Sequence, residues 1–351
     1  MLAIVKENRD LSTRLILVSI VAVSLAGVAV AALSVTGAGA TFPYPMYSKW
    51  FYEYHKLHPD VEINYKSLGS TAGIRQVTEG TVDFGASDGP MNDQQMQEFK
   101  QKRNCEILHF PTVLGADVPT YHIPGVTTEL NFTPAALAGI FLGKITKWND
   151  TELAKANPKV NLPNHDVIVV HRAEASGTTY VWVDYLSKVS PEWKQKVGVG
   201  QAVNWPVGLA EKGNEGVSGK VNQTAYSIGY VELAYAIQNK LPYGLVQNAA
   251  GSFVKADLVS VTAAAAGAAA NMPADFRVSI TNARGQGAYP ISGFTWLLIP
   301  SKIPDAAKQK TVVDFLHWML GPGQTLAASL SYAQLPQQVV TQELKAIAKI
   351  Q

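Results

Sequence analysis

Apolar and polar positions alternate between a helical and a strand period along most of the chain. Apolar residues recur at helical spacing over 45–58, and they alternate with polar residues over 61–65 as in a strand. A small-residue turn at 69–73 is followed by a helical pattern over 74–79 and a short apolar strand over 81–86. This order of strand, turn, helix and strand predicts parallel strands joined by crossover helices.

The second half of the chain continues the same order of elements. Apolar runs predict buried strands over 166–171 and 291–299, and a helical pattern over 178–188 follows the first of them. Further helices are predicted over 132–142, 151–156, 263–270, 311–320 and 342–350, and the segment 229–241 continues the α/β order. The hydrophobic pattern therefore predicts an α/β fold.

The first 32 residues have the pattern of an export signal. Three basic residues precede an uncharged run over 15–33, which contains the small-x-small motif Ala29-Val30-Ala31. Residues 1–32 are therefore interpreted as a signal peptide, with the mature chain beginning near Ala32. The run is also long enough to span a bilayer, so an uncleaved anchor is the alternative.

Composition limits the class of protein. A length of 351 residues allows two domains of ordinary size, and 47% hydrophobic residues indicate a globular chain. A formal net charge of +2 gives no broad positive surface for nucleic acid. Cys105 is the only cysteine, so no intramolecular disulfide can form. These properties favour a bacterial periplasmic protein over a small disulfide-rich extracellular module.

Three small-residue turns carry hydroxyl groups, and each is expected to open a helix. They are Ala40-Thr41-Phe42, Gly69-Ser70-Thr71 and Ser176-Gly177-Thr178. Ligands of α/β proteins bind at the carboxyl ends of the strands, where helix N-termini offer free N–H groups to anions. Three such turns could form one anion site, although three unrelated helix caps are the alternative interpretation.

Two charged residues near these turns fit an anion that carries a proton. The guanidinium of Arg172 offers a planar fork of hydrogen-bond donors. Asp88 ends the segment TVDFGASD, and its carboxylate can accept a hydrogen bond from a phosphate O–H group. Sulfate offers no such proton at neutral pH, so the same carboxylate would repel it. Sites built on one hydrogen-bonding partner discriminate by about 10⁴–10⁵-fold.

Seven segments of the chain together resemble one known family. They are TGAGATFPYPMYSKW, YKSLGSTAGIRQV, TVDFGASDGP, FLGKITKWND, VVHRAEASGTTYVWVDYL, NWPVGLAEKGNEGV and SIGYVELAYA. In this order they resemble the periplasmic phosphate-binding proteins of bacterial phosphate-specific ABC transporters, the PstS family. The resemblance implies a two-lobed α/β fold of the type II periplasmic-binding-protein class, with orthophosphate in the cleft between the lobes and no cofactor or metal.

The resemblance also implies lobe boundaries and binding residues. One lobe would comprise 33–114 plus 285–351, and the other 115–284, with a hinge at the two crossings. Glu174 stands where the family usually has an aspartate that pairs with the arginine, and Ala175 replaces a glycine. The segment 94–105 is longer than expected and is interpreted as a surface helix. The implied phosphate-binding residues are Thr41, Phe42 (through its backbone N–H), Ser70, Asp88, Arg172, Ser176, Gly177 and Thr178, with Glu174 in support.

The function implied by the resemblance is high-affinity phosphate binding in the periplasm. The expected partners are inorganic phosphate and the permease and ATPase subunits of the importer. The protein is expected to be a monomer that binds no nucleic acid. A binding protein for another tetrahedral oxyanion, or a phosphate sensor without transport, is the alternative.

Enzyme and metal sites have weaker support in the sequence. Ser176 lies in A-S-G-T rather than in a G-x-S-x-G elbow, and His171 alternates to the strand face opposite Arg172. The segment 139–144 lacks the spacing and hydroxyl residue of a P-loop. His55 and His58 have no further ligand set nearby in the sequence, so a solvated helix face is the better interpretation.

Overall fold

A computed structural model describes residues 32–351 of the chain. The expected signal peptide over residues 1–32 therefore lies outside the described part, except for its last residue. Within 32–351, none of the helices has both the length and the apolar character that crossing a bilayer requires.

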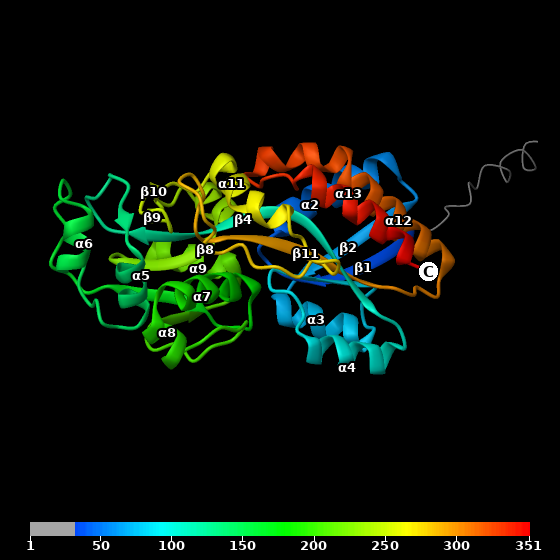
Figure 1. Cartoon of the computed structure of the whole chain (residues 1–351), viewed down its shortest axis with the longest axis horizontal. Coiled ribbons are helices and arrows are strands. Elements are labelled where there is room, and N and C mark those ends of the chain that lie inside the picture. Colours follow the sequence, from blue (N-terminus) through cyan, green and yellow to red (C-terminus); the bar gives the residue numbers. More distant parts are fainter. Residues whose placement is uncertain (1–31) are drawn as a thin grey trace, which may run out of the picture.

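A mixed sheet of eight strands forms the centre of the molecule (Figure 1). The strand order is β2-β1-β3-β11-β4-β8-β6-β7. The bounds are β1 Leu33–Gly39, β2 Val61–Ser67, β3 Phe84–Ser87, β4 Ile107–His122, β6 Ile168–Arg172, β7 Leu209–Glu211, β8 Ser227–Glu232 and β11 Ser292–Pro300. Strands β2, β1 and β3 pair in parallel, as do β7, β6 and β8, which confirms the predicted crossovers.

Strand β4 joins these two parallel groups. It pairs with β11 up to Ala116 and with β8 from Asp117 onward, in both cases antiparallel. The hydrophobic pattern does not reveal this strand, because Pro111 and Pro119 interrupt it and proline is rare in central strands. The register of this ladder shifts between Thr295 and Trp296, next to the first proline.

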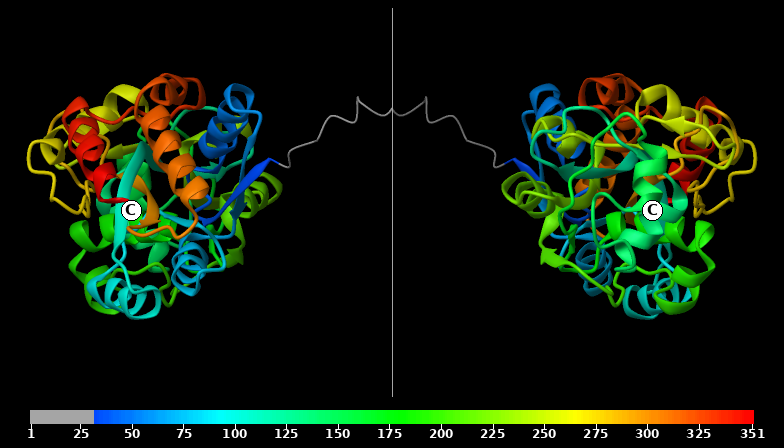
Figure 2. Two further views of the ribbon diagram at one scale, coloured as in Figure 1. Left: turned by 90° about the vertical axis from the view of Figure 1, so that its right-hand side faces the viewer. Right: turned by 90° about the vertical axis from the view of Figure 1, so that its left-hand side faces the viewer.

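Helices cover both faces of the sheet (Figures 1 and 2). Those that follow the strands of the first group are α2 Tyr44–Leu57, α3 Ser70–Glu79 and α4 Asp93–Arg103. The others are α5 Pro134–Phe141, α6 Thr151–Ala156, α7 Gly177–Val189, α8 Pro191–Lys196, α9 Gly213–Gln223, α10 Leu233–Gln238, α11 Leu258–Ala269, α12 Ala306–Leu320 and α13 Gln337–Ala346. Helix α4 is the predicted surface helix, and Phe99 is its one buried residue.

Short elements complete the described part of the chain. The strands β5 Asn131–Phe132, β9 Leu245–Gln247 and β10 Phe253–Val254 form a three-stranded sheet of their own. Two 3₁₀ helices, Pro322–Leu330 and Ile347–Lys349, flank α13 in the carboxyl-terminal region.

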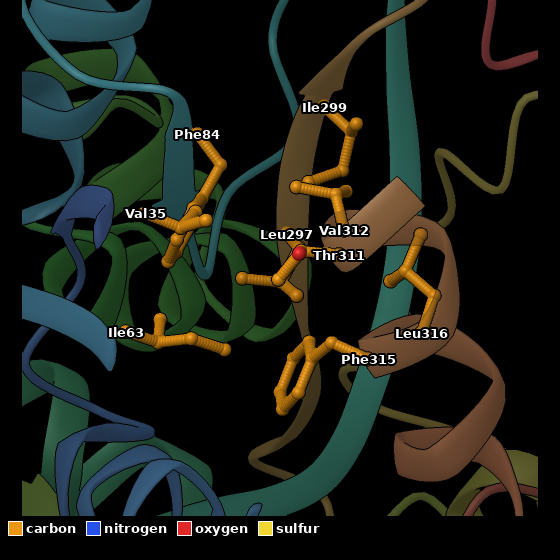
Figure 3. Close-up of a pocket in the computed structure, with 9 residues that line it drawn as sticks. All are labelled: Val35, Ile63, Phe84, Leu297, Ile299, Thr311, Val312, Phe315 and Leu316. Carbon is orange, nitrogen blue, oxygen red and sulfur yellow. The ribbon is translucent and has the colours of Figure 1, made fainter. Parts of the chain in front are cut away.

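The carboxyl-terminal helix α12 packs against strands from the start of the chain (Figure 3). Val35 of β1, Phe84 of β3 and Leu297 of β11 surround a small gap with Val312 and Phe315 of α12. The gap has a volume of about 10 Å³, and its lining is apolar apart from Thr311, so a water molecule there would have too few hydrogen-bond partners. The two ends of the described chain thus share one apolar core, and this gap is not a polar ligand site.

Glu343 of α13 is a buried carboxyl group, and neither of its oxygens has a hydrogen-bond partner. Burial raises the pKa of Glu343 well above its usual value of 4.5. The folded state therefore holds a proton that the unfolded chain releases above that value. Its stability falls as pH rises towards the folded pKa, by up to about 1.4 kcal/mol per pH unit.

Glu343→Gln is expected to remove this pH dependence, because glutamine keeps the shape without a titrating group. The variant should have a higher free energy of unfolding than the wild type at about pH 8 and a similar one near pH 5. Urea unfolding at both pH values checks this, with Glu62→Gln on the exposed edge of β2 as the control. A Glu343→Gln variant that keeps the wild-type pH slope contradicts the expectation.

Candidate functional site

Ser70, Asp88 and Gly177 meet in the interior although they come from distant parts of the chain. Ser70 begins α3, Asp88 follows β3, and Gly177 begins α7. The backbone N–H of Gly177 donates to Ser70 Oγ at 3.0 Å, and that of Asp88 donates to the same oxygen at 3.2 Å. Ser70 and Asp88 are both buried. The N-termini of α3 and α7 therefore converge on one hydroxyl group.

Gly177 allows this close approach. A Cβ atom at position 177 would lie 2.4 Å from Ser70 Oγ and 2.5 Å from Asp88 Oδ2. Both distances are shorter than van der Waals contact permits, so any side chain here would push α7 away from α3. The glycine is thus required by packing, in addition to any role of its N–H group.

The three hydroxyl turns do open helices, as predicted, but only one hydroxyl caps its helix. Ser176 is the N-cap of α7 and accepts a hydrogen bond from Thr179 N at 3.2 Å. The N-caps of α2 and α3 are Pro43 and Gly69, which make no side-chain capping bond. The alternative interpretation of three unrelated helix caps therefore does not hold for Ser70. Ser70 is the first residue of α3, and its hydroxyl oxygen accepts hydrogen bonds from the backbone N–H groups of Gly177 and Asp88 instead.

Arg172 ends β6 with its side chain 1% exposed. Its Nη1 donates to Thr178 Oγ1 at 3.2 Å, and its Nε donates to Glu174 Oε1 at 3.1 Å. Nη2 donates to the same carboxylate oxygen. The backbone N–H of Gly213 also donates to Glu174 Oε1, at 3.1 Å. The longer Glu174 thus still pairs with Arg172.

The carboxylate of Glu174 is stabilised in its charged form. Burial alone would raise its pKa, but hydrogen bonding and the charge of Arg172 lower the pKa below its usual value. The guanidinium is therefore held by an ionised partner on one side. Its Nη1 edge faces Thr178, where a ligand can add charge-assisted hydrogen bonds.

The first hydroxyl turn is fixed by two buried tyrosines. Tyr235 Oη donates to the carbonyl oxygen of Thr41, and Tyr332 Oη donates to that of Phe42, each at 2.6 Å. Thr41 and Phe42 are themselves buried. Thr41 Oγ1 accepts a hydrogen bond from Asn214 Nδ2 at 2.8 Å, which connects this turn to the start of α9.

Asp88 is a buried acid that titrates near neutral pH. Burial raises its pKa to about 7, against the opposing effects of Thr295, Arg172 and Ser70. Thr295 Oγ1 donates to Asp88 Oδ1 at 2.8 Å. The carboxyl group therefore changes between an acceptor and a donor form within the physiological pH range.

Two further acids, Asp117 and Glu232, lie directly opposite each other on β4 and β8. Both are buried. Burial raises the pKa of each well above its usual value, and Asp88 raises both further. Their neutral forms are therefore favoured. Two neutral acids compensate the positive charge of Arg172 less than two carboxylates would.

All eight expected binding residues gather in this region. Arg172, Thr178 and Asn214 form a hydrogen-bonded chain that reaches Thr41. Within 32–351, no group of histidine, cysteine, aspartate and glutamate has an arrangement that could hold a metal ion. The expected residues are Thr41, Phe42, Ser70, Asp88, Arg172, Ser176, Gly177 and Thr178. They combine hydroxyl and N–H donors with one guanidinium, which suits an anion.

Three residues of the region were not predicted as site residues. Asn214 lies in the segment NWPVGLAEKGNEGV, which contributed to the resemblance but had no assigned role. Thr295 lies within an apolar strand pattern, where a threonine gives no signal. Gln201 accepts from Thr71 Oγ1 at 2.6 Å through its side chain and from Ser176 N at 2.7 Å through its backbone. Only the tertiary structure reveals these contacts.

Comparison with known proteins places the chain in a family. Residues 26–322 match the model of the PBP superfamily domain. The chain is 44% identical over 311 residues to the phosphate-binding protein PstS of Xylella fastidiosa, covering 88% of this chain and 84% of the relative. The chain belongs to the PstS family. A PstS protein of Methanocaldococcus jannaschii is 39% identical, covering 89% of this chain and 85% of that protein.

Solved structures of phosphate-binding proteins share the fold of this PstS-family chain. A periplasmic phosphate-binding protein with bound phosphate has a TM-score of 0.69 at 19% identity, covering 90% of this chain and 93% of its own. A phosphate ABC transporter substrate-binding protein from Clostridium perfringens has a TM-score of 0.62 at 17% identity, covering 87% and 100%. The predicted α/β fold of the periplasmic-binding-protein class is thereby confirmed.

Proposed function

We propose that the protein binds inorganic phosphate in the periplasm and delivers it to the membrane permease of an ABC importer, whose ATPase subunit supplies the energy. The observation that carries the proposal is that Ser70, Gly177 and Arg172 all lie close enough to one buried acid, Asp88, to contact it or act on its charge. The names of the relatives support the same ligand. Like other members of its family, the protein is a binding protein and not an enzyme.

The eight clustered residues are proposed to contact the phosphate, with Glu174 holding Arg172. A buried anion is stable only when nearly all of its oxygens are hydrogen-bonded. Three hydroxyl-bearing helix starts and a guanidinium supply the donors. Asp88 in its carboxylate form accepts a hydrogen bond that a protonated anion donates. No cofactor is needed for this binding.

Two lobes are proposed to close over the anion, one formed by 33–114 and 285–351 and the other by 115–284. The change of pairing partner of β4 between Ala116 and Asp117 supports this boundary. Contacts between the proposed lobes, such as Gly177 with Ser70, support a closed arrangement. The protein is proposed to act as a monomer, since one chain supplies every residue of the cluster.

Titration calorimetry with phosphate and sulfate tests the proposed function, using the mature chain after bound phosphate has been removed. Phosphate is expected to bind at least about 10⁴-fold more tightly than sulfate, because only phosphate can donate to Asp88. Arsenate, which is also protonated, tests the alternative of another tetrahedral oxyanion. Equal affinities for phosphate and sulfate, or no binding of phosphate, contradict the proposal.

A further inference from the structure

Asn214 is a buried residue at the start of α9, and every polar atom of its side chain has a partner. Its Oδ1 accepts from the backbone N–H of Glu232 at 2.9 Å. Its Nδ2 donates to Thr41 Oγ1 at 2.8 Å and to Thr178 Oγ1 at 3.1 Å. A backbone N–H can only donate, so it determines which end of the amide is the oxygen. The NH₂ group must therefore face the two threonines.

This orientation determines what the two hydroxyl groups can do. A hydroxyl has one proton to donate and two lone pairs that accept. Thr178 Oγ1 accepts from Asn214 Nδ2 and from Arg172 Nη1 at 3.2 Å, so both of its lone pairs are occupied. Its O–H proton must point elsewhere. Thr41 Oγ1 likewise accepts from the amide, which cannot accept in return through its NH₂ group.

We infer that Asn214 is a positioning residue that orients the hydroxyl protons of Thr41 and Thr178 towards the bound anion. The inference rests on the proposed function and deepens it. Thr178 can then only donate to the ligand and the proton of Thr41 is free to do the same, so Asp88 is left as the charged acceptor for a proton of the ligand. Asn214 thus contributes to selection of a protonated tetrahedral anion without needing to touch it.

The local backbone supports this role of Asn214. Gly213 has φ +73°, in the left-handed region that favours glycine, and its N–H donates to Glu174 Oε1 at 3.1 Å. Two consecutive residues thereby fix the carboxylate that holds Arg172 and the amide that orients both threonines. The same amide connects the proposed lobes, because Thr41 belongs to one and Thr178 to the other.

Asn214→Asp is the sharpest test, since it keeps the shape and replaces the NH₂ group, with its two N–H donors, by an oxygen that can only accept. The threonine protons would then turn towards the carboxylate and away from the phosphate. Phosphate affinity at about pH 8 is expected to fall at least about 100-fold, because two hydrogen bonds to a charged ligand are lost. Near pH 5 the new carboxyl group protonates and regains one donor. The deficit relative to wild type should therefore shrink, which a merely structural role would not produce.

Asn157→Asp is the matched control, because Asn157 is also buried and its Nδ2 donates to the carbonyl oxygens of Asn131 and Leu153. It should keep the wild-type phosphate affinity. Asn214→Ala, expected to lose about tenfold, decides the matter if the aspartate variant does not fold. A folded Asn214 variant that binds within about twofold of wild type overturns the inference. A wild type that binds no phosphate contradicts the proposed function instead.

Discussion

Arg172→Ala is expected to lower phosphate affinity at least about 100-fold, since hydrogen bonds to charged groups each contribute about 1.5–3 kcal/mol. The side chain is almost fully buried, so a cationic side chain on the surface cannot take its place in the variant. Its loss also leaves Glu174 without its ionic partner beside the ligand. Repulsion between this carboxylate and the anion adds to the effect.

Calorimetry on three variants separates these contributions. Arg75→Ala, on an exposed position of α3, removes the same charge outside the cluster and should bind phosphate like the wild type. The double variant Arg172→Ala with Glu174→Ala should recover part of the loss, because it removes the unpaired carboxylate. A wild-type titration curve for Arg172→Ala would exclude the arginine from the site.

Asp88→Asn is expected to have its largest effect on the rejection of sulfate. The amide can donate a hydrogen bond to a sulfate oxygen, whereas the carboxylate can only repel it. The preference for phosphate should fall from about 10⁴-fold or more to about 10²-fold or less. Competition titration of phosphate against sulfate measures this ratio, and a ratio equal to that of the wild type would place Asp88 outside the site.

The pH dependence gives a second test of Asp88. Its raised pKa of about 7 means that the carboxylate predominates at pH 8 and the neutral acid at pH 6. The neutral acid can donate to sulfate just as asparagine can. Sulfate affinity of the wild type should therefore rise as pH falls from 8 to 6, while that of D88N should stay constant. Parallel pH profiles for the two proteins would contradict this assignment.

The local elements of the fold were largely predictable from the sequence. The helix predicted over 151–156 has the same bounds in the structure, and Asp150 caps it as its side chain suggests. The strand predicted over 81–86 is shorter and begins at Phe84. Asp83 directly precedes this start, and its carboxylate accepts a hydrogen bond from the backbone N–H of Thr36 on β1. The hydrophobic periodicity therefore predicts that a strand is present here, but it does not predict the residue at which the strand begins.

Contacts between distant segments could not be predicted in this way. Tyr332 Oη reaches the carbonyl of Phe42 across 290 positions of sequence, and nothing in either local pattern indicates it. Charged groups and turns of the site were visible because arginine, aspartate and glycine are unusual next to buried strands. Asn214 and Thr295 were not, because an amide or a hydroxyl has the same sequence signal in a cap, a turn or a binding site.

The continuous strand β4 has a consequence for the unfolding of the molecule. All but two of its 16 residues are buried, and it supplies a neighbour to β11 along one part and to β8 along the other. If either half of the sheet melted, β4 would lose backbone hydrogen-bond partners along part of its length. The same strand also completes the other half of the sheet. The two proposed lobes should therefore melt in a single cooperative transition, as one thermodynamic unit.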